Sequence, residues 1–223
     1  MASSLRFTES AVASDALTFA RRAAHLGDGA VRLQAAGGVL VMTCAALSPQ
    51  SLLDATPTVL GMRMVPVDPE LICDLVVPGD SLTLDPGGRE VALPETAVSA
   101  TWAGVSPPRG GWSEAGSVQA ATLAHRAQWG IAAVAEALPA APGEEIVRTA
   151  RSEIWGAADP DLDGMPRGVA FAAHALGFIA GEEQARVFHA GPWTRLSLHR
   201  GHVLTRSTVR SGLTGVRRTG HRA

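Results

Sequence analysis

Aromatic, basic and histidine side chains gather in two stretches of the chain whose residue types could bind an anion. The first is the loop Trp102–Trp112, which is rich in proline and glycine and contains Arg109. Two indole rings could wall a pocket there, while the guanidinium holds a carboxylate or a phosphate. The second stretch supplies further candidates of the same kinds: Trp193, Arg195, His199 and His202. If both stretches faced one cleft, these residues would form an anion site.

A structural interpretation competes with this one at each position. Proline can stiffen the loop into a turn whose tryptophans fill the core, and two histidines on a surface hairpin are ordinarily plain polar residues. On the sequence alone, this simpler interpretation is favoured. A shared cleft requires that the two stretches meet in space, which their spacing along the chain does not determine.

The segment His199-Arg-Gly-His202 would also place two imidazoles across a hairpin turn. They could share a metal ion there, provided that a third ligand such as His189 came from elsewhere. The chain contains neither Cys-x-x-Cys nor His-x-x-x-His, the spacings typical of zinc sites. We therefore predict no metal site and no cofactor.

Alternating aspartates at Asp159, Asp161 and Asp163 precede a glycine, as they do at the start of a calcium-binding loop. An EF-hand needs a bidentate glutamate at the twelfth position, where this chain has Ala170. Aspartates in a loop between two predicted helices commonly cap the helices or remain in water. We favour that interpretation, and the sequence leaves cation binding by this loop open.

Two residue types that many enzymes use are missing from the chain, which contains no Lys and no Tyr. The absence of Lys excludes a Schiff base, a P-loop lysine and a kinase-type phosphate-pairing lysine. The absence of Tyr excludes a phenolic acid, base or nucleophile. No Ser/His/Asp triad can be assigned without geometry. We therefore assign no catalytic residue and leave open whether the chain is an enzyme.

Charge is divided unevenly along the chain. Residues 1–183 contain 11 Arg and 21 acidic residues, a net charge of −10, whereas residues 184–223 contain 8 Arg and no acid. Such a division can indicate an anionic partner such as nucleic acid. More often, a basic strand packs beside the acidic body of its own fold or of a second subunit. Nucleic-acid binding is the less favoured prediction, because no aromatic residues are interleaved with the C-terminal arginines.

The composition is that of a globular protein, with 46% hydrophobic and 18% charged residues. The N-terminus lacks the apolar core of a signal peptide, and Cys44 and Cys73 lie within apolar runs, as free thiols do in a reducing compartment. Residues 33–53 carry no charge, but Gln34, a glycine pair and Pro49 interrupt this window. The apolar run that remains is too short for a membrane-spanning helix. We predict a cytoplasmic protein without a membrane segment.

Hydrophobic periodicity and turn residues predict the elements that must position these side chains. An amphipathic helix is expected over 8–26, and Gly37-Gly38 predicts a hairpin between strands 31–36 and 39–47. Further strands are expected over 58–67, 91–103, 185–189, 193–199 and 202–208, and 71–77 is ambiguous between strand and helix. Three helices are expected over 117–138, 144–155 and 169–179.

This order predicts an α+β fold with a largely antiparallel sheet: an N-terminal helix, strands, three helices, and strands again. No internal repeat is visible in the sequence. We expect residues 1–209 to form a single domain and residues 210–223 to form a basic, mobile tail.

Three segments resemble those of an uncharacterised protein family from high-GC actinobacteria. They are Leu53–Gly61, Thr101–Trp112 and Gly191–Val203, and the similarity extends over most of the chain to about Arg206. The resemblance implies no reaction, because no activity is known for that family. It therefore adds no catalytic residue to those considered above.

Two functional hypotheses follow. The favoured one is a non-catalytic protein that self-associates as a homo-oligomer, or binds a partner, through its basic C-terminal β-region. The alternative is an enzyme or sensor that binds a small anionic metabolite through the Arg, His and Trp residues of the two stretches.

Overall fold

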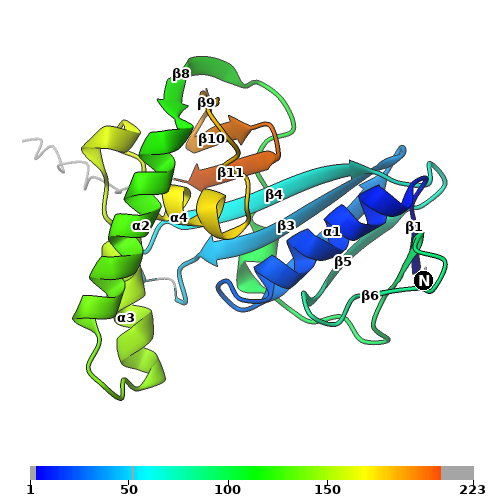
Figure 1. The fold of residues 1–223 in the computed structure, drawn as a ribbon, viewed down its shortest axis with the longest axis horizontal. Coiled ribbons are helices and arrows are strands. Elements are labelled where there is room, and N and C mark those ends of the chain that lie inside the picture. The colour runs from blue at the N-terminus through cyan, green and yellow to red at the C-terminus, as the bar shows by residue number, and fades with distance from the viewer. Residues whose placement is uncertain (1–3, 52, 207–223) are drawn as a thin grey trace, which may run out of the picture.

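The largest element of the fold is an antiparallel sheet of eight strands (Figure 1). The computed structural model describes residues 4–51 and 53–206, so the predicted tail 210–223 lies outside the described residues. The strands, in their order across the sheet, are β5 (Cys73–Pro78), β2 (Ala30–Ala36), β3 (Val39–Leu47), β4 (Thr58–Pro66), β11 (Gly201–Arg206), β10 (Trp193–Leu198), β9 (Gln184–Ala190) and β8 (Ser113–Gln119). The ambiguous run 71–77 thus forms an edge strand.

The predicted α+β class and the order of its elements are confirmed. The helices are α1 (Ser10–Ala23), α2 (Ala120–Ala137), α3 (Glu144–Gly156) and α4 (Gly168–Ala175). A small second sheet joins β1 (Ser4–Arg6), β7 (Glu90–Ala92) and β6 (Thr83–Leu84). No helix within residues 4–51 and 53–206 has the length and apolar character needed to cross a bilayer.

The hairpin between β2 and β3 forms as predicted, for a local reason. Gly37 and Gly38 both adopt positive φ, at 60° and 82°, which a two-residue hairpin turn of this kind requires and which side chains other than glycine disfavour. Strand β3 then pairs with β2 on one side and with β4 on the other, and most of its side chains are buried. Its unbroken apolar sequence follows from this central position.

The structure shows a repeat of topology that the sequence does not show. Helix α1 precedes the consecutive antiparallel strands β2, β3 and β4, and helices α2 to α4 precede β9, β10 and β11. The last strands of the two sets, β4 and β11, lie side by side, with Gly61 opposite Val203. The two sets therefore build one continuous sheet, although their residues do not repeat.

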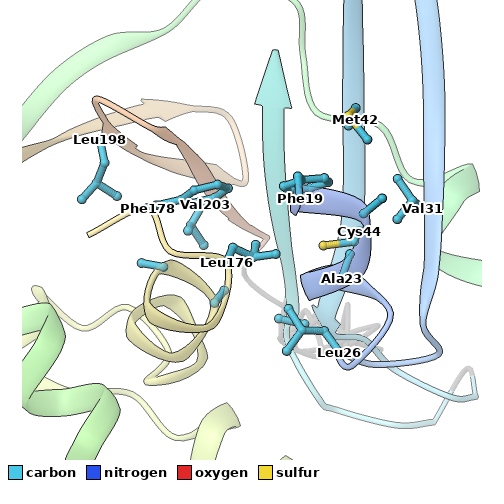
Figure 2. Close-up of a cluster of buried hydrophobic side chains, with 14 of the residues drawn as sticks. Phe19, Ala23, Leu26, Val31, Met42, Cys44, Leu176, Phe178, Leu198 and Val203 are labelled. Carbon is cyan, nitrogen blue, oxygen red and sulfur yellow. The ribbon is translucent and has the colours of Figure 1, made fainter. Parts of the chain in front are cut away.

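Helices α1 and α4 cover one face of this sheet (Figures 1 and 2). Phe19 and Ala23 of α1 lie beside Met42 and Cys44, and Leu176, just after α4, packs near Gly61. Because side chains alternate between the faces of a strand, the residues next to these point to the opposite face. We call that opposite side the open face.

Several predicted boundaries differ from the structure. The helix expected over 169–179 ends at Ala175, and that expected over 8–26 spans Ser10–Ala23. The segment 91–103 was expected to be a strand, but only β7, which ends two residues before Pro94, and a 3₁₀ turn over Thr101–Gly104 are regular. The helix expected over 117–138 begins only at Ala120, because residues 117–119 belong to β8. Pairing of β8 with β9 explains this difference, since the polar residues of β8 give no periodic signal of their own.

Close contact between α2 and α3 leads to a stability prediction. A Cβ atom at Gly130 would collide with the six-membered ring of Trp155, which is buried and stacks on Phe171 with 4.6 Å between ring centroids. Gly130→Ala gains up to ~1 kcal/mol of helix propensity, but overpacking costs about 1–3 kcal/mol. We expect a net loss of about 1 kcal/mol in urea unfolding.

The control for this variant is Gly110→Ala, because a Cβ atom there meets nothing within 4 Å. Its free energy of unfolding should change by less than about 0.5 kcal/mol. A Gly130→Ala protein that is more stable than the wild type would contradict the packing argument.

Candidate functional site

A cleft of about 530 Å³ lies on the open face of the sheet. Strands β2, β3, β4 and β11 contribute its floor, β5 and β10 contribute one residue or two each, and residues 101–112 cover it. We call these covering residues the roof loop. The floor includes Arg32, Thr43, Met62 and His202, which stand next to one another in a row across the four strands. The roof contributes Trp102, Val105, Pro107, Pro108 and Trp112, among others.

The structure brings five of the seven predicted site residues to this cleft. They are Trp102, Arg109, Trp112, Arg195 and His202. Trp193 lies instead in a small buried cluster with Leu60 and Leu204. His199 is exposed in the turn between β10 and β11, where its backbone N–H donates to Glu183 over 2.9 Å. The residue opposite His202 across the hairpin is Ser197, not His199.

Arg195 has the most unusual environment in the cleft. Its guanidinium carbon lies 4.6 Å from the ring centroid of Trp112 and 4.7 Å from that of Phe188. Within residues 4–51 and 53–206, no carboxylate pairs with Arg195, and its buried Nε has no hydrogen-bond partner. Burial lowers the pKa of this guanidinium, and nearby Arg186 lowers it further. An arginine nevertheless keeps its charge at neutral pH.

Arg32 joins the roof loop to the sheet. Its Nε and Nη2 donate to the two carboxylate oxygens of Asp74 on β5, over 2.8 and 2.9 Å. Its Nη1 donates to the carbonyl of Ala103 and to the hydroxyl of Ser106. The Arg32 guanidinium keeps the pKa of Asp74 below its usual value. The charge of Arg32 is therefore already balanced, and its role is to position the roof.

Two further hydrogen bonds orient the tryptophans of the roof. The indole N–H of Trp102 donates to Asp28 over 2.8 Å, and that of Trp112 donates to the carbonyl of Pro108 over 3.1 Å. Trp102 is buried against Leu60, whereas Trp112 is half-buried and faces Arg195. One tryptophan thus fills the core, as the simpler interpretation held, and the other forms a wall of the cleft.

His202 lies beside Arg195 as a neutral imidazole. Burial is the main cause that lowers the pKa of His202, and the positive charges of Arg195 and Arg63 lower this pKa further. Its Nδ1 is 3.0 Å from the hydroxyl of Ser197. A serine–histidine pair can serve nucleophilic catalysis when a carboxylate orients the histidine and the hydroxyl faces the substrate. Here the charges that act on His202 are cationic, and Ser197 does not line the cleft.

The aspartate loop between α3 and α4 is occupied by arginine side chains. Asp159 is buried and pairs with Arg126 and Arg167, over 3.4 and 3.2 Å, and Asp161 also pairs with Arg126. The Asp159 carboxylate further accepts the N–H of Asp161 over 3.0 Å. Two guanidinium groups thus neutralise the carboxylates that a calcium ion would need, and the loop acts as a link between helices.

Sequence reasoning did not identify several residues of the site. Two of them, Arg32 and Asp74, line the cleft, and a third, Phe188, contacts Arg195. None of the three lies in the loop Trp102–Trp112 or is one of the candidates from Trp193 to His202. Arg32 could have been suspected, because it is a charged residue within a strand that was expected to be half-buried. Nothing local indicated that Phe188 would stack on Arg195, because that contact depends on the register between β9 and β10.

Two family models match the chain, and both are described as domains of unknown function. DUF8010 matches residues 1–104, and DUF8185 matches residues 107–210. No curated protein matches the chain. The prediction that the chain resembles proteins of unknown function is therefore confirmed, whereas a restriction to actinobacteria stays a prediction. Both matched segments contribute to the cleft, since Arg32 and Met62 lie in the first and Arg195 and His202 in the second.

Solved structures with a similar course of the backbone include bacterial DNA polymerase sliding clamps. A DnaN clamp from Bartonella birtlesii, bound to griselimycin, has a TM-score of 0.49 and 13% identity over 91% of this chain and 64% of its own. A putative DNA polymerase III β subunit from Eubacterium rectale has a TM-score of 0.48 and 5% identity over 92% of this chain and 64% of its own. A sliding clamp from Caulobacter crescentus has a TM-score of 0.48 and 13% identity over 99% of this chain and 69% of its own. This chain therefore spans about two thirds of their length.

The position of Arg32 predicts how firmly the roof loop is held. Arg32→Gln removes the paired bonds to Asp74 and weakens those to Ala103 and Ser106. If the free energy that holds the roof loop against the sheet fell by about one or two kcal/mol, the fraction of molecules with a detached loop would rise roughly 5- to 30-fold. Trypsin should then cleave faster after Arg109, as measured by mass spectrometry of the peptides. Arg6→Gln, which breaks an exposed pair with Glu90, is the control, and equal cleavage rates in both variants would refute the attachment.

The lowered pKa of His202 predicts a dependence of stability on pH. The unfolded chain binds a proton at His202 near the usual pKa of 6.5, whereas the folded protein binds it only at lower pH. Stability should therefore fall as the pH drops below 6.5. We expect the fall in melting temperature between pH 7.5 and 5.5 to be smaller in His202→Gln than in wild type. The variant His199→Gln, which alters an exposed histidine, controls for the loss of an imidazole. If the melting temperature of His202→Gln fell as much as that of the wild type, His202 would not be the source of the pH dependence.

Proposed function

We propose that this protein binds a small anionic ligand in the cleft on its open face, with Arg195 as the anchoring cation. The observation that carries the proposal is the environment of Arg195, a guanidinium that contacts two aromatic rings and has no carboxylate partner within residues 4–51 and 53–206. Arg195 is half-buried, and a charge that has lost part of its water is ordinarily paired, because desolvation is costly. An anionic ligand would supply the missing partner and could accept two parallel hydrogen bonds from the guanidinium.

The surroundings of Arg195 support binding more than catalysis. Cation–π contacts with two aromatic rings restrain the guanidinium, so that little side-chain freedom is lost when a ligand binds. A volume of about 530 Å³ lies within the range of small-molecule sites. The neighbouring His202 has a lowered pKa, which makes it a weak base at neutral pH, and it remains available as a hydrogen-bonding group.

A pair of fluorescent probes tests the anchoring role of Arg195. The dye 8-anilinonaphthalene-1-sulfonate carries one sulfonate, and N-phenyl-1-naphthylamine has the same rings without it. Arg195→Met keeps an unbranched side chain between the aromatic rings and removes the charge. Loss of a charge-assisted contact should weaken sulfonate dye binding roughly 10- to 100-fold, while the affinity for the neutral dye should change less than twofold. The measurement is a fluorescence titration of both proteins with both dyes.

The matched control is Arg21→Met, which removes an exposed arginine of α1 on the other side of the sheet. It should bind both dyes as the wild type does. Arg195→Met should unfold at the same or a higher temperature than wild type, because it removes a desolvated charge. Equal affinity of wild type and Arg195→Met for the sulfonate dye would overturn the proposal.

Self-association is the second candidate function, and the uneven charge along the chain favours it. Of the eight C-terminal arginines, Arg200 and Arg206 are exposed, while Arg186 pairs with Glu114 and Arg195 lines the cleft. The other four lie outside the described residues. Exposed charges are screened beyond about 8–10 Å at physiological ionic strength, so an electrostatic oligomer should dissociate at high salt. An unchanged native mass from low to high salt would count against this candidate.

A further inference from the structure

The floor of the cleft changes character with distance from Arg195. On the open face, the row that contains Arg195 continues through Leu204 to Leu60 on β4. Moving along β4 away from that row, the next side chains on this face are Met62 and Met64. Strand rise places Met64 roughly 13 Å along β4 from Leu60. The cleft therefore has a cationic end and an apolar strip along β4, which is flanked at Met62 by the polar side chains of Thr43 and His202.

Apolar side chains at the far end of this floor are left in water. Met64 is 48% exposed and Val39 is 41% exposed, and both line the cleft together with Val41. A ligand that extended from Arg195 across Met62 would cover these side chains, and each buried CH₂ group would add to its affinity.

The cationic end provides one uncompensated charge. Arg32 is balanced by Asp74, and His202 is neutral at pH 7. Arg109 stands in the exposed part of the roof loop, where water screens its charge. A ligand with one negative charge matches this count, whereas a phosphate dianion would leave one charge without a partner at the buried end.

We propose that the ligand is an amphipathic monocarboxylate, with its carboxylate on Arg195 and its hydrocarbon body along Met62 toward Met64 and Val39. This inference rests on the proposed function and specifies the ligand class of the same site. The carboxylate accepts hydrogen bonds from the guanidinium. His202 lies two residues from Leu204, the residue opposite Arg195, and lines the same cleft.

Displacement of the sulfonate dye by a series of straight-chain acids tests the inference. Acetate, hexanoate, octanoate and decanoate share one carboxylate and differ only in the length of the apolar chain. Affinity should rise about fourfold with each added CH₂ between hexanoate and decanoate. Octanamide, which has no charge, should bind at least about 10-fold more weakly than octanoate, and octyl phosphate should not bind more tightly than octanoate.

Two variants locate the ends of the ligand. Met64→Glu places a carboxylate at the apolar end and should weaken octanoate and decanoate at least about 10-fold, with little effect on the affinity for acetate. Ile146→Glu is the matched control, since Ile146 is 50% exposed on α3 and does not line the cleft. Arg195→Met should weaken every acid in the series.

The outcomes separate this inference from the proposed function. If binding of the sulfonate dye does not depend on Arg195, the proposed function fails, and the inference fails with it. If dye binding does depend on Arg195 but affinity is the same for acetate and decanoate, or octyl phosphate binds most tightly, the monocarboxylate is overturned and anion binding stands. An equal effect of Met64→Glu and Ile146→Glu on decanoate would likewise overturn the placement of the chain.

Discussion

The pairing of β4 with β11 holds the two halves of the large sheet together. It joins two sets of strands that lie far apart in the chain into one sheet, with Met62 opposite His202 and Leu60 opposite Leu204. Each set has a helix of its own, and α1 and α4 both contact β3 and β4 from the same side. Backbone hydrogen bonds alone do not select this pairing. Packing of Leu176 against Gly61 of β4 and stacking of Phe178 on Phe19 of α1, with 6.1 Å between ring centroids, favour it. Each of these contacts joins the two sets, so the apolar groups leave water together only when the sets are joined.

The helices cover one face of the sheet, and the roof loop covers part of the other. The Arg32–Asp74 pair is formed between neighbouring strands, so it is held rigidly, and the bonds to Ala103 and Ser106 extend that rigidity to the loop. Polar groups that fasten the roof are thus fully bonded. Arg195 differs, because its aromatic neighbours position the guanidinium without neutralising it. This contrast between a hydrogen-bonded and an unpaired arginine in one cleft is the reason for proposing Arg195, and not Arg32, as the ligand-binding charge.

Much of the fold could be predicted from the sequence, because it follows from local patterns. The Gly37-Gly38 turn, the apolar run of β3 and the amphipathic helix α1 each depend on residues within one or two turns or strands of one another. Strand β8 could not be predicted in the same way, since its polar residues become a strand only by pairing with β9. Part of the site could be predicted from residue types alone, namely Arg195, His202, Trp112 and Arg109. The contributions of Met62 and Phe188 could not, because they depend on the register between paired strands.

The class of the fold, the order of its helices and strands, and the residue types that could bind an anion follow from the sequence alone. Local propensity and turn conformation carry that information, because they act between neighbours in the chain. Which of Arg32 and Arg195 lacks a carboxylate partner within the described residues depends instead on the tertiary structure. Arg32 and Arg195 are both arginines in strands, and nothing near either of them in the sequence separates their roles. Strand register and packing place Asp74 against the first and two aromatic rings against the second, and those contacts depend on the whole sheet.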